Sequence, residues 1–128
     1  MDQNTAANAY RQASIENAPP VKLVRLLFEG AIRFLDRAAA EDAGDPRSSF
    51  LHFVGRTDAI VSELRLSIDH EIGGEVTENL ERLYVFCEDE LGNASIERCA
   101  DRLPAVRNVL ETLLEAWRAV EIESTRVA

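Results

Sequence analysis

Residues 9–35 read AYRQASIENAPPVKLVRLLFEGAIRFL, a polar lead that passes into a strongly apolar stretch. Pro19 and Pro20 favour a helix start, where a missing backbone N–H costs little. From residue 21 apolar side chains recur every three or four positions, which predicts a helix to about residue 41. They span about 180° of the helical wheel, whereas a helix packed on one side needs only about 100°. This helix is therefore covered on two sides by its own chain, or it offers apolar surface to a partner.

Three further amphipathic helices are predicted, over residues 47–71, 75–91 and about 101–122. Gly73 and Gly74 predict a tight turn between the first two of these, and Gly92-Asn93 is expected to end the helix over residues 75–91. Short connections make neighbouring helices antiparallel. The chain is thus predicted to be all-α, an antiparallel up-and-down four-helix bundle.

A single domain is predicted, because 128 residues suffice to bury one core. The helical bundle is expected to occupy residues 19–123. Residues 1–18 lack apolar periodicity, which predicts a flexible N-terminal arm with Tyr10 among its few large side chains. Residues 124–128 are expected to fray.

Composition and charge argue against several classes of partner. The net charge is −9 with a pI near 4.7, whereas nucleic-acid binding depends on an excess of basic groups. No apolar run approaches the roughly 18 residues of a spanning helix, and the first residues lack the pattern of a secretory signal. We therefore expect a cytosolic protein with no nucleic-acid partner and no membrane insertion.

Residue types that carry catalysis or bind metals are sparse. His52 and His70 each follow a serine by three positions, so the Glu-x-x-His motif of di-metal bundles is missing. Cys87 and Cys99 lack Cys-x-x-Cys spacing, and the sequence has no glycine-rich phosphate loop. We expect no enzymatic activity, no catalytic residue, no metal site and no cofactor.

Second apolar faces on the predicted helices point to a binding module instead. Within residues 47–71, Leu51 and Leu66 lie on a different side from the main apolar stripe. Val85 and Phe86 also lie off the stripe of their helix. A domain with spare apolar surface that is acidic elsewhere fits the recognition of amphipathic helices in grooves.

The order of several short motifs is similar to that of the flagellar secretion chaperone family FliS. Tyr10, Ala-Pro-Pro at residues 18–20 and LLFEGAIRFL at residues 26–35 resemble the family's opening, Tyr…Ala-Ser-Pro…Leu-Tyr-Asp/Asn-Gly-Ala. Residues 59–84, AIVSELRLSIDHEIGGEVTENLERLY, resemble its Glu-Leu…Ser-Leu-Asp…Gly-Gly…Asn-Leu…Leu-Tyr stretch. Trp117 matches its late tryptophan. The resemblance covers the chain from about residue 10 to 120.

Three positions depart from the family's pattern. Pro19 stands where serine is usual, Phe28 where tyrosine is usual, and Glu29 where aspartate or asparagine is common. These changes keep the shape of the segment and alter its hydrogen bonding, so they concern fine contacts rather than the resemblance itself.

The resemblance implies a cytosolic chaperone that binds newly made flagellin. Such a protein holds the C-terminal helical segment of flagellin against the outside of the bundle, prevents its premature polymerisation and delivers it to the flagellar type III secretion apparatus. Spare apolar faces, together with the family position of Tyr10, give the residues expected to contact flagellin: Tyr10, Leu26, Phe28, Ile32, Leu51, Leu66, Val85 and Phe86.

Two other interpretations stay open at this stage. A histidine phosphotransfer bundle would use His52, although Gly55 and Arg56 follow it in the reverse of the usual order. A structural bundle would self-associate through the same apolar faces, and several expected contact residues would then complete the core or a dimer contact. For the chaperone we expect a monomer or a weak homodimer.

Overall fold

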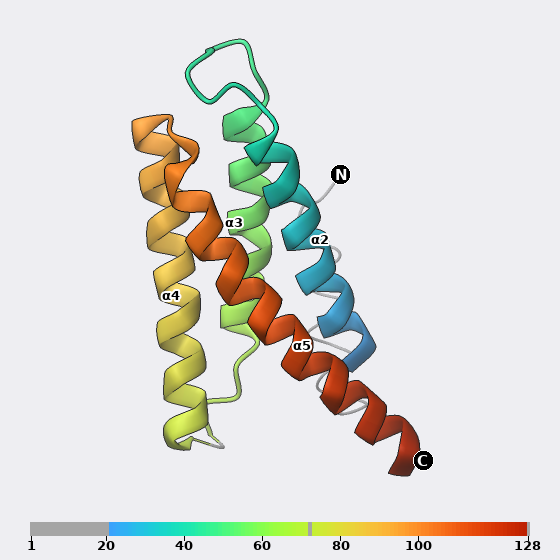
Figure 1. Cartoon of the computed structure of the whole chain (residues 1–128). Helices are drawn as coiled ribbons and strands as arrows, with labels where there is room; N and C mark the ends of the chain where they lie inside the picture. The colour runs from blue at the N-terminus through green and yellow to red at the C-terminus, as the bar shows by residue number, and fades with distance from the viewer. Residues whose placement is uncertain (1–20, 72, 128) are drawn as a thin grey trace, which may run out of the picture.

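Four helices and one 3-10 turn make up the part of the chain that the computed structural model describes, residues 21–71 and 73–127, with side chains as far as residue 123. Helix α2 lies beside α3 and α5, and α4 also lies beside α3 and α5 (Figure 1). Successive helices run in opposite directions, so the predicted all-α, antiparallel up-and-down bundle is confirmed. The elements are α2 (Val21–Ala39), α3 (Phe50–Leu66), α4 (Gly74–Glu97), the 3-10 turn η1 (Ala100–Arg102) and α5 (Leu103–Val127).

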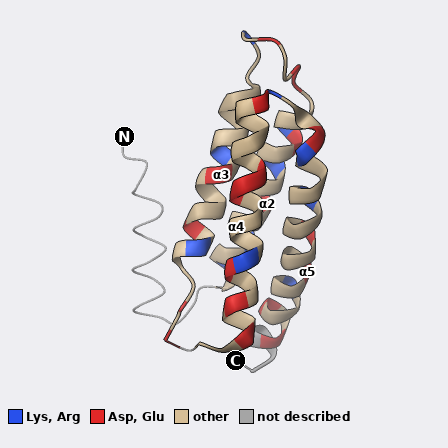
Figure 2. Ribbon diagram, turned by 90° about the vertical axis from the view of Figure 1, so that its left-hand side faces the viewer, with Lys and Arg blue, Asp and Glu red and all other residues tan. Residues whose placement is uncertain are grey.

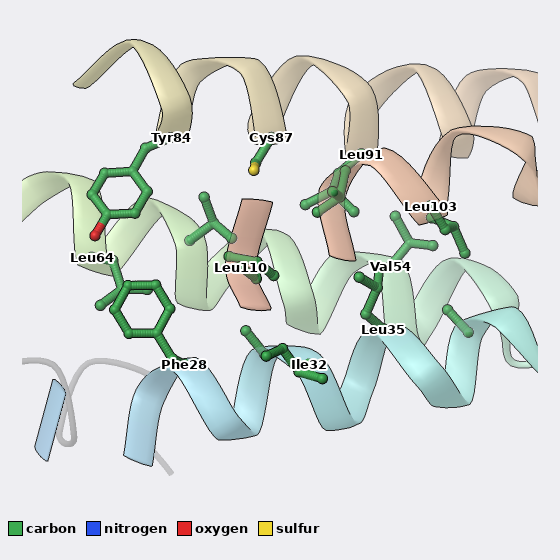
Figure 3. Close-up of a cluster of buried hydrophobic side chains, with 14 of the residues drawn as sticks. Phe28, Ile32, Leu35, Val54, Leu64, Tyr84, Cys87, Leu91, Leu103 and Leu110 are labelled. Atoms are coloured by element: carbon green, nitrogen blue, oxygen red, sulfur yellow. The ribbon is translucent and has the colours of Figure 1, made fainter. Parts of the chain in front are cut away.

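One face of every helix contributes to a common core (Figure 3). Phe28 of α2 and Tyr84 of α4 point toward one another across the bundle, with ring centroids 6.4 Å apart. Thr57 of α3 is also buried, and its hydroxyl donates to the Phe53 carbonyl at 2.9 Å, so its burial is compensated. The largest fully buried apolar side chains are Phe28, Leu35, Phe50, Val54, Val61, Leu64, Cys87, Leu91, Val106 and Leu110.

Helix α3 is shorter than residues 47–71, the range that its apolar stripe predicts. At its start the Ser49 N–H donates to Glu41 Oε1 at 2.6 Å. At its end the Ser67 hydroxyl donates to the Leu64 carbonyl at 2.7 Å. The apolar pattern continues past the end of the helix, where Ile68 still packs on the core, so periodicity alone does not mark this end.

Helix α4 runs to Glu97, so the prediction that Gly92-Asn93 ends it is wrong. A glycine inside a helix costs roughly 0.5–1 kcal/mol relative to alanine. Leu91 and Ala94 flank this position and are fully buried, and their packing offsets that cost. The helix ends instead at Arg98, whose left-handed backbone (φ 48°) turns the chain so that the Cys99 N–H donates to the Ala94 carbonyl at 3.2 Å.

Two glycines turn the chain from α3 into α4, as the sequence predicts. Gly73 has φ 64° and Gly74 has φ 89°, both in the left-handed region that favours glycine. Helix α4 therefore starts at Gly74 and returns antiparallel to α3 (Figure 1).

Helix α5 extends to Val127, beyond residue 122 where its end was predicted. The fraying of residues 124–128 concerns motion and stays a prediction. The expected arm, residues 1–18, and the helix start at Pro19 and Pro20 lie outside the described residues. None of the helices within residues 21–71 and 73–127 combines the length and the hydropathy that a membrane span requires.

We predict that Gly92→Ala stabilises the protein by about 0.5–1 kcal/mol, because it removes the conformational cost of glycine inside a helix. The position has room, since no atom that would crowd an added Cβ lies within 4 Å of it. Urea unfolding followed by circular dichroism measures the change. The same substitution at Gly74 is the matched control and should lower stability, because the backbone there has φ 89°. A loss of stability in Gly92→Ala would contradict a continuous α4.

Candidate protein-binding surface

Large apolar side chains remain exposed on all four helices. They are Leu26, Leu51, Leu66, Val76, Leu83, Val85, Phe86, Ile96, Val120 and Ile122. Single exposed leucines are normal on folded proteins, whereas contiguous groups mark interaction sites. The grouping of these side chains along the helices therefore decides which of them form a candidate site.

The structure separates the residues expected to contact a client. The exposed ones are Leu26, Leu51, Leu66, Val85 and Phe86. Phe28 and Ile32 lie in the core, with exposed fractions of 0% and 7%, so the expectation that they form surface is wrong. The physical reason is that α3 and α5 cover the wide apolar arc of α2 from both sides. Tyr10 lies outside the described residues.

One group of apolar side chains lies where α4 and α5 diverge. These helices approach one another near η1 and separate toward the opposite end of the bundle (Figure 1). Exposed side chains from both helices lie on the sides that face each other, next to half-buried ones that pack on the core. We define the α4–α5 strip as Leu80, Leu83, Phe86, Val109, Leu113, Trp117 and Val120.

An ion pair identifies the side of α4 that carries the strip. Arg102, the last residue of η1 and the one directly before α5, pairs with Glu90 at 3.2 Å and with Glu97 at 3.0 Å. Leu83 and Phe86 precede Glu90 by two turns and one turn, so they lie on the same side of α4. That side faces α5.

Ion pairs on α5 mark the side that faces α2. Arg107 pairs with Asp36 at 2.7 Å, and Arg25 of α2 pairs with Glu121 at 2.6 Å. Val109 lies about 160° around the helix from Arg107, and the other strip residues of α5 lie about 80–140° from it in the same direction. The strip on α5 therefore faces α4, and the opposite side of α5 is closed by charged contacts with α2.

Apolar periodicity assigns Val76, Leu83 and Val120 to core stripes, yet all three are exposed, Val76 by 75%. Helix α3 has 17 residues, whereas α4 has 24 and α5 has 25. At 1.5 Å per residue the difference is about 10 Å, so α4 extends past α3 at Val76. Leu83 lies between Glu81 and Glu88, the two partners of Arg65 on α3, so it is exposed because α4 and α5 diverge. Residues 67–69 include the apolar Ile68, which packs on the core, so the sequence has no polar run that marks the end of α3.

A second group follows the seam between α3 and α4. Arg65 Nε donates to Glu88 Oε1 at 2.6 Å across this seam. Leu66 and Val85 lie within one turn of this bridge, and Leu51 lies about four turns from Leu66. The polar bridge interrupts the apolar residues, so this seam is less continuous than the α4–α5 strip.

One carboxylate on α3 lacks a hydrogen-bond partner. Asp58 Oδ1 is buried without such a partner among the described residues. Burial raises the pKa of this carboxyl, the Glu88 carboxylate adds to the rise, and Arg65 lowers it in part. Ionised Asp58 therefore opposes folding at neutral pH.

Reactive side chains do not gather on the described surface. Burial raises the pKa of the Cys87 thiol to about 12, so it stays protonated at neutral pH and is a poor nucleophile. Within the described ranges, no three His, Cys, Asp or Glu side chains lie together as a metal site. His52 is exposed on α3, with its ring centroid 5.2 Å from that of Phe53.

Known proteins resemble the chain over nearly its whole length. Residues 2–124 match the family model described as flagellar protein FliS. The chain is 40% identical over 125 residues to the flagellar secretion chaperone FliS of Campylobacter jejuni, covering 98% of both chains. It is 31% identical over 117 residues to FliS of Salmonella typhimurium, covering 88% of this chain and 87% of the relative. It is also 31% identical over 121 residues to FliSB of Pseudomonas aeruginosa, covering 90% and 94%. The resemblance drawn from the sequence is confirmed.

We predict that Asp58→Asn stabilises the protein at neutral pH and that the gain disappears below pH 3.8, the ordinary pKa of the group. Because its folded-state pKa is raised, the folded state binds the proton more tightly than the unfolded state, and the carboxyl costs stability as pH rises through this range. Urea unfolding at several pH values measures the gain. Asp89→Asn, an exposed control on α4, should change stability little. An equal gain at every pH would contradict a cost of ionisation.

We predict that Phe28→Ala lowers stability by about 3–5 kcal/mol, because it opens a cavity in the core. Leu66→Ala removes a side chain that is 60% exposed and should change stability by less than about 0.5 kcal/mol. Urea unfolding measures both, and Phe28→Leu provides a milder variant if the alanine variant does not fold. Similar effects at the two positions would contradict the assignment of Phe28 to the core and Leu66 to the surface.

Proposed function

Because the chain belongs to the FliS family of flagellar proteins, we propose that it is an export chaperone for flagellin. It binds the C-terminal helical segment of newly made flagellin in the cytosol, prevents premature polymerisation and delivers the client to the flagellar type III secretion apparatus. It acts by binding alone, without a catalytic step or a cofactor. Support comes from the relatives, which are called flagellar secretion chaperones.

The observation that carries the proposal is the α4–α5 strip. Leu83, Phe86 and Val120 are 37%, 40% and 43% exposed, so each packs on its own chain and still offers area to a ligand. An amphipathic helix laid along the strip buries that area. Each such side chain contributes about 1–2 kcal/mol at about 25 cal/mol per Å² of buried apolar surface. Several must act together to offset the cost of association, which suits a long helical client.

Charge around the strip supports binding to another protein rather than to a second copy. Acidic positions are spread along α4 (Figure 2), and the chain carries a net charge of −9. Two copies that meet through the same strip bring like charges together, which opposes association. This repulsion supports a monomer or a weak homodimer in the absence of client.

Further contacts with the client belong to the same proposal. Leu26, Leu51, Leu66 and Val85 are exposed on the outer sides of α2, α3 and α4. A client longer than one helix reaches them when it wraps around the bundle. From the family resemblance, we also propose that Tyr10 lies beside the bound client.

Co-expression with flagellin tests the proposal. We predict that the tagged protein forms a one-to-one complex with flagellin from the same organism and does not bind flagellin that lacks its last 40 or so residues, about two helices of roughly 20 residues. Pull-down followed by size exclusion with light scattering measures binding and stoichiometry. The absence of a complex with full-length flagellin would overturn the proposal.

Two aspartate variants locate the contact in the same experiment. Phe86→Asp should weaken the complex by at least about tenfold, because binding then buries an unpaired carboxylate. Ile96→Asp is the matched control, since Ile96 is also on α4, is 83% exposed and lies outside the strip. It should leave affinity within about twofold of the wild type, the scale of a neutral surface substitution. Equal affinities of the two variants would argue against the strip as the contact.

A further inference from the structure

Two phenylalanines and two arginines form a cluster across α2 and α3, the helices that do not carry the α4–α5 strip. The ring centroids of Phe34 and Phe53 are 6.3 Å apart, with planes inclined by 26°. Arg56 Cζ lies 5.3 Å from the centroid of the Phe34 ring, and Arg37 Cζ lies 5.8 Å from that of Phe53. Both rings are half-buried and both arginines are exposed. We name these four residues the Arg–Phe cluster.

The arginines of this face lack an acidic partner. Among the described residues, no carboxylate lies within ion-pair distance of Arg37, Arg56 or Arg33, which precedes Arg37 by one turn. The arginines on the other seams of the bundle pair with acids: Arg25, Arg65, Arg102, Arg107 and Arg118. The chain carries a net charge of −9, but three arginines without an acidic partner make this face locally positive.

The geometry of the cluster suits a carboxylate ligand. An arginine stacked on an aromatic ring uses the flat face of its guanidinium, and the N–H groups at its edge stay available to donate in pairs. A carboxylate accepts two such bonds at once. The half-buried rings below offer apolar surface, and a ligand that covers them also excludes water from the ion pair, which strengthens it.

We propose that the Arg–Phe cluster is a second docking site, which takes an acidic segment of a partner protein that has apolar side chains next to its carboxylates. The carboxylates pair with Arg33, Arg37 and Arg56, and the apolar side chains cover the two rings. Nucleic acid suits the site less well, because its affinity grows with the number of phosphates neutralised and this face offers three arginines. Since the cluster and the α4–α5 strip lie on different helices, both can be occupied at the same time.

Fluorescence anisotropy of labelled synthetic peptides with the full-length protein tests this site. The acidic probe is a peptide of about 15 residues, near the minimum for an isolated helix, with Asp and Glu around one Leu and one Phe. One matched probe replaces the acids by Lys, and a second replaces Leu and Phe by Ala. The acidic probe should bind more tightly than either, and its affinity should fall as salt is added.

Variants assign the binding to the cluster. The double variant Arg37→Gln/Arg56→Gln should bind the acidic probe about tenfold more weakly, because two charge-assisted contacts are lost. The double variant Arg47→Gln/Arg82→Gln, which removes two exposed arginines outside the cluster, is the charge-matched control and should bind like the wild type. Circular dichroism confirms that each variant is folded. Flagellin is absent from this measurement, so its outcome is independent of the proposed function.

Several outcomes would overturn the proposal. They are no binding of the acidic probe, equal binding of the acidic and lysine probes, and unchanged binding in the Arg37→Gln/Arg56→Gln variant. Tighter binding of a single-stranded oligonucleotide than of the acidic probe would assign the face to nucleic acid. A dimer in light scattering that the Arg37→Gln/Arg56→Gln variant abolishes would assign the face to a second copy of the chain.

Discussion

The length of α3 limits how much of its neighbours the core can cover. This helix ends after 17 residues, whereas α4 and α5 continue to 24 and 25. Beyond that point the apolar positions of the longer helices keep their spacing and lose a partner on one side. Near η1, α4 and α5 lie close together, and at the opposite end of the bundle they separate (Figure 1). The unequal helix lengths expose Val76, whereas the α4–α5 strip is exposed because α4 and α5 diverge.

Ion pairs cover the outer side of some of the seams between helices and leave other seams uncovered. Individual exposed ion pairs contribute only about 0–1 kcal/mol, yet each one occupies the outer side of a seam with ordered side chains. Between α2 and α5, Arg25, Arg107 and Arg118 all reach acids on the facing helix. Between α4 and α5 such pairs occur near Arg102, where they lower the pKa of Glu97. The remaining length of that seam exposes apolar side chains, and the α2–α3 face exposes stacked arginines.

Apolar periodicity predicted the helices and the bundle because it identifies the positions that face inward, but it does not measure how far a neighbouring helix extends. Leu51 and Leu66 were correctly predicted to be exposed, since they lie clearly off their stripe. The prediction for Phe28 was wrong because a helix with an apolar arc of 180° is either buried on two sides or exposes part of that arc. Only the positions of α3 and α5 distinguish these two cases. Leu83 lies on its stripe and is still exposed. At Gly92 a local stop signal was overridden by the burial of adjacent side chains.

The position of Trp117 gives this protein an intrinsic optical reporter. It is the single tryptophan of the chain and lies half-buried in the α4–α5 strip. Indole is amphipathic, and its emission moves to shorter wavelengths when water leaves its surroundings. A helix that docks on the strip dehydrates this ring, whereas a ligand on α2 and α3 leaves it in contact with solvent. The emission wavelength of Trp117 therefore distinguishes a ligand on the α4–α5 strip from a ligand on the Arg–Phe cluster in unlabelled protein.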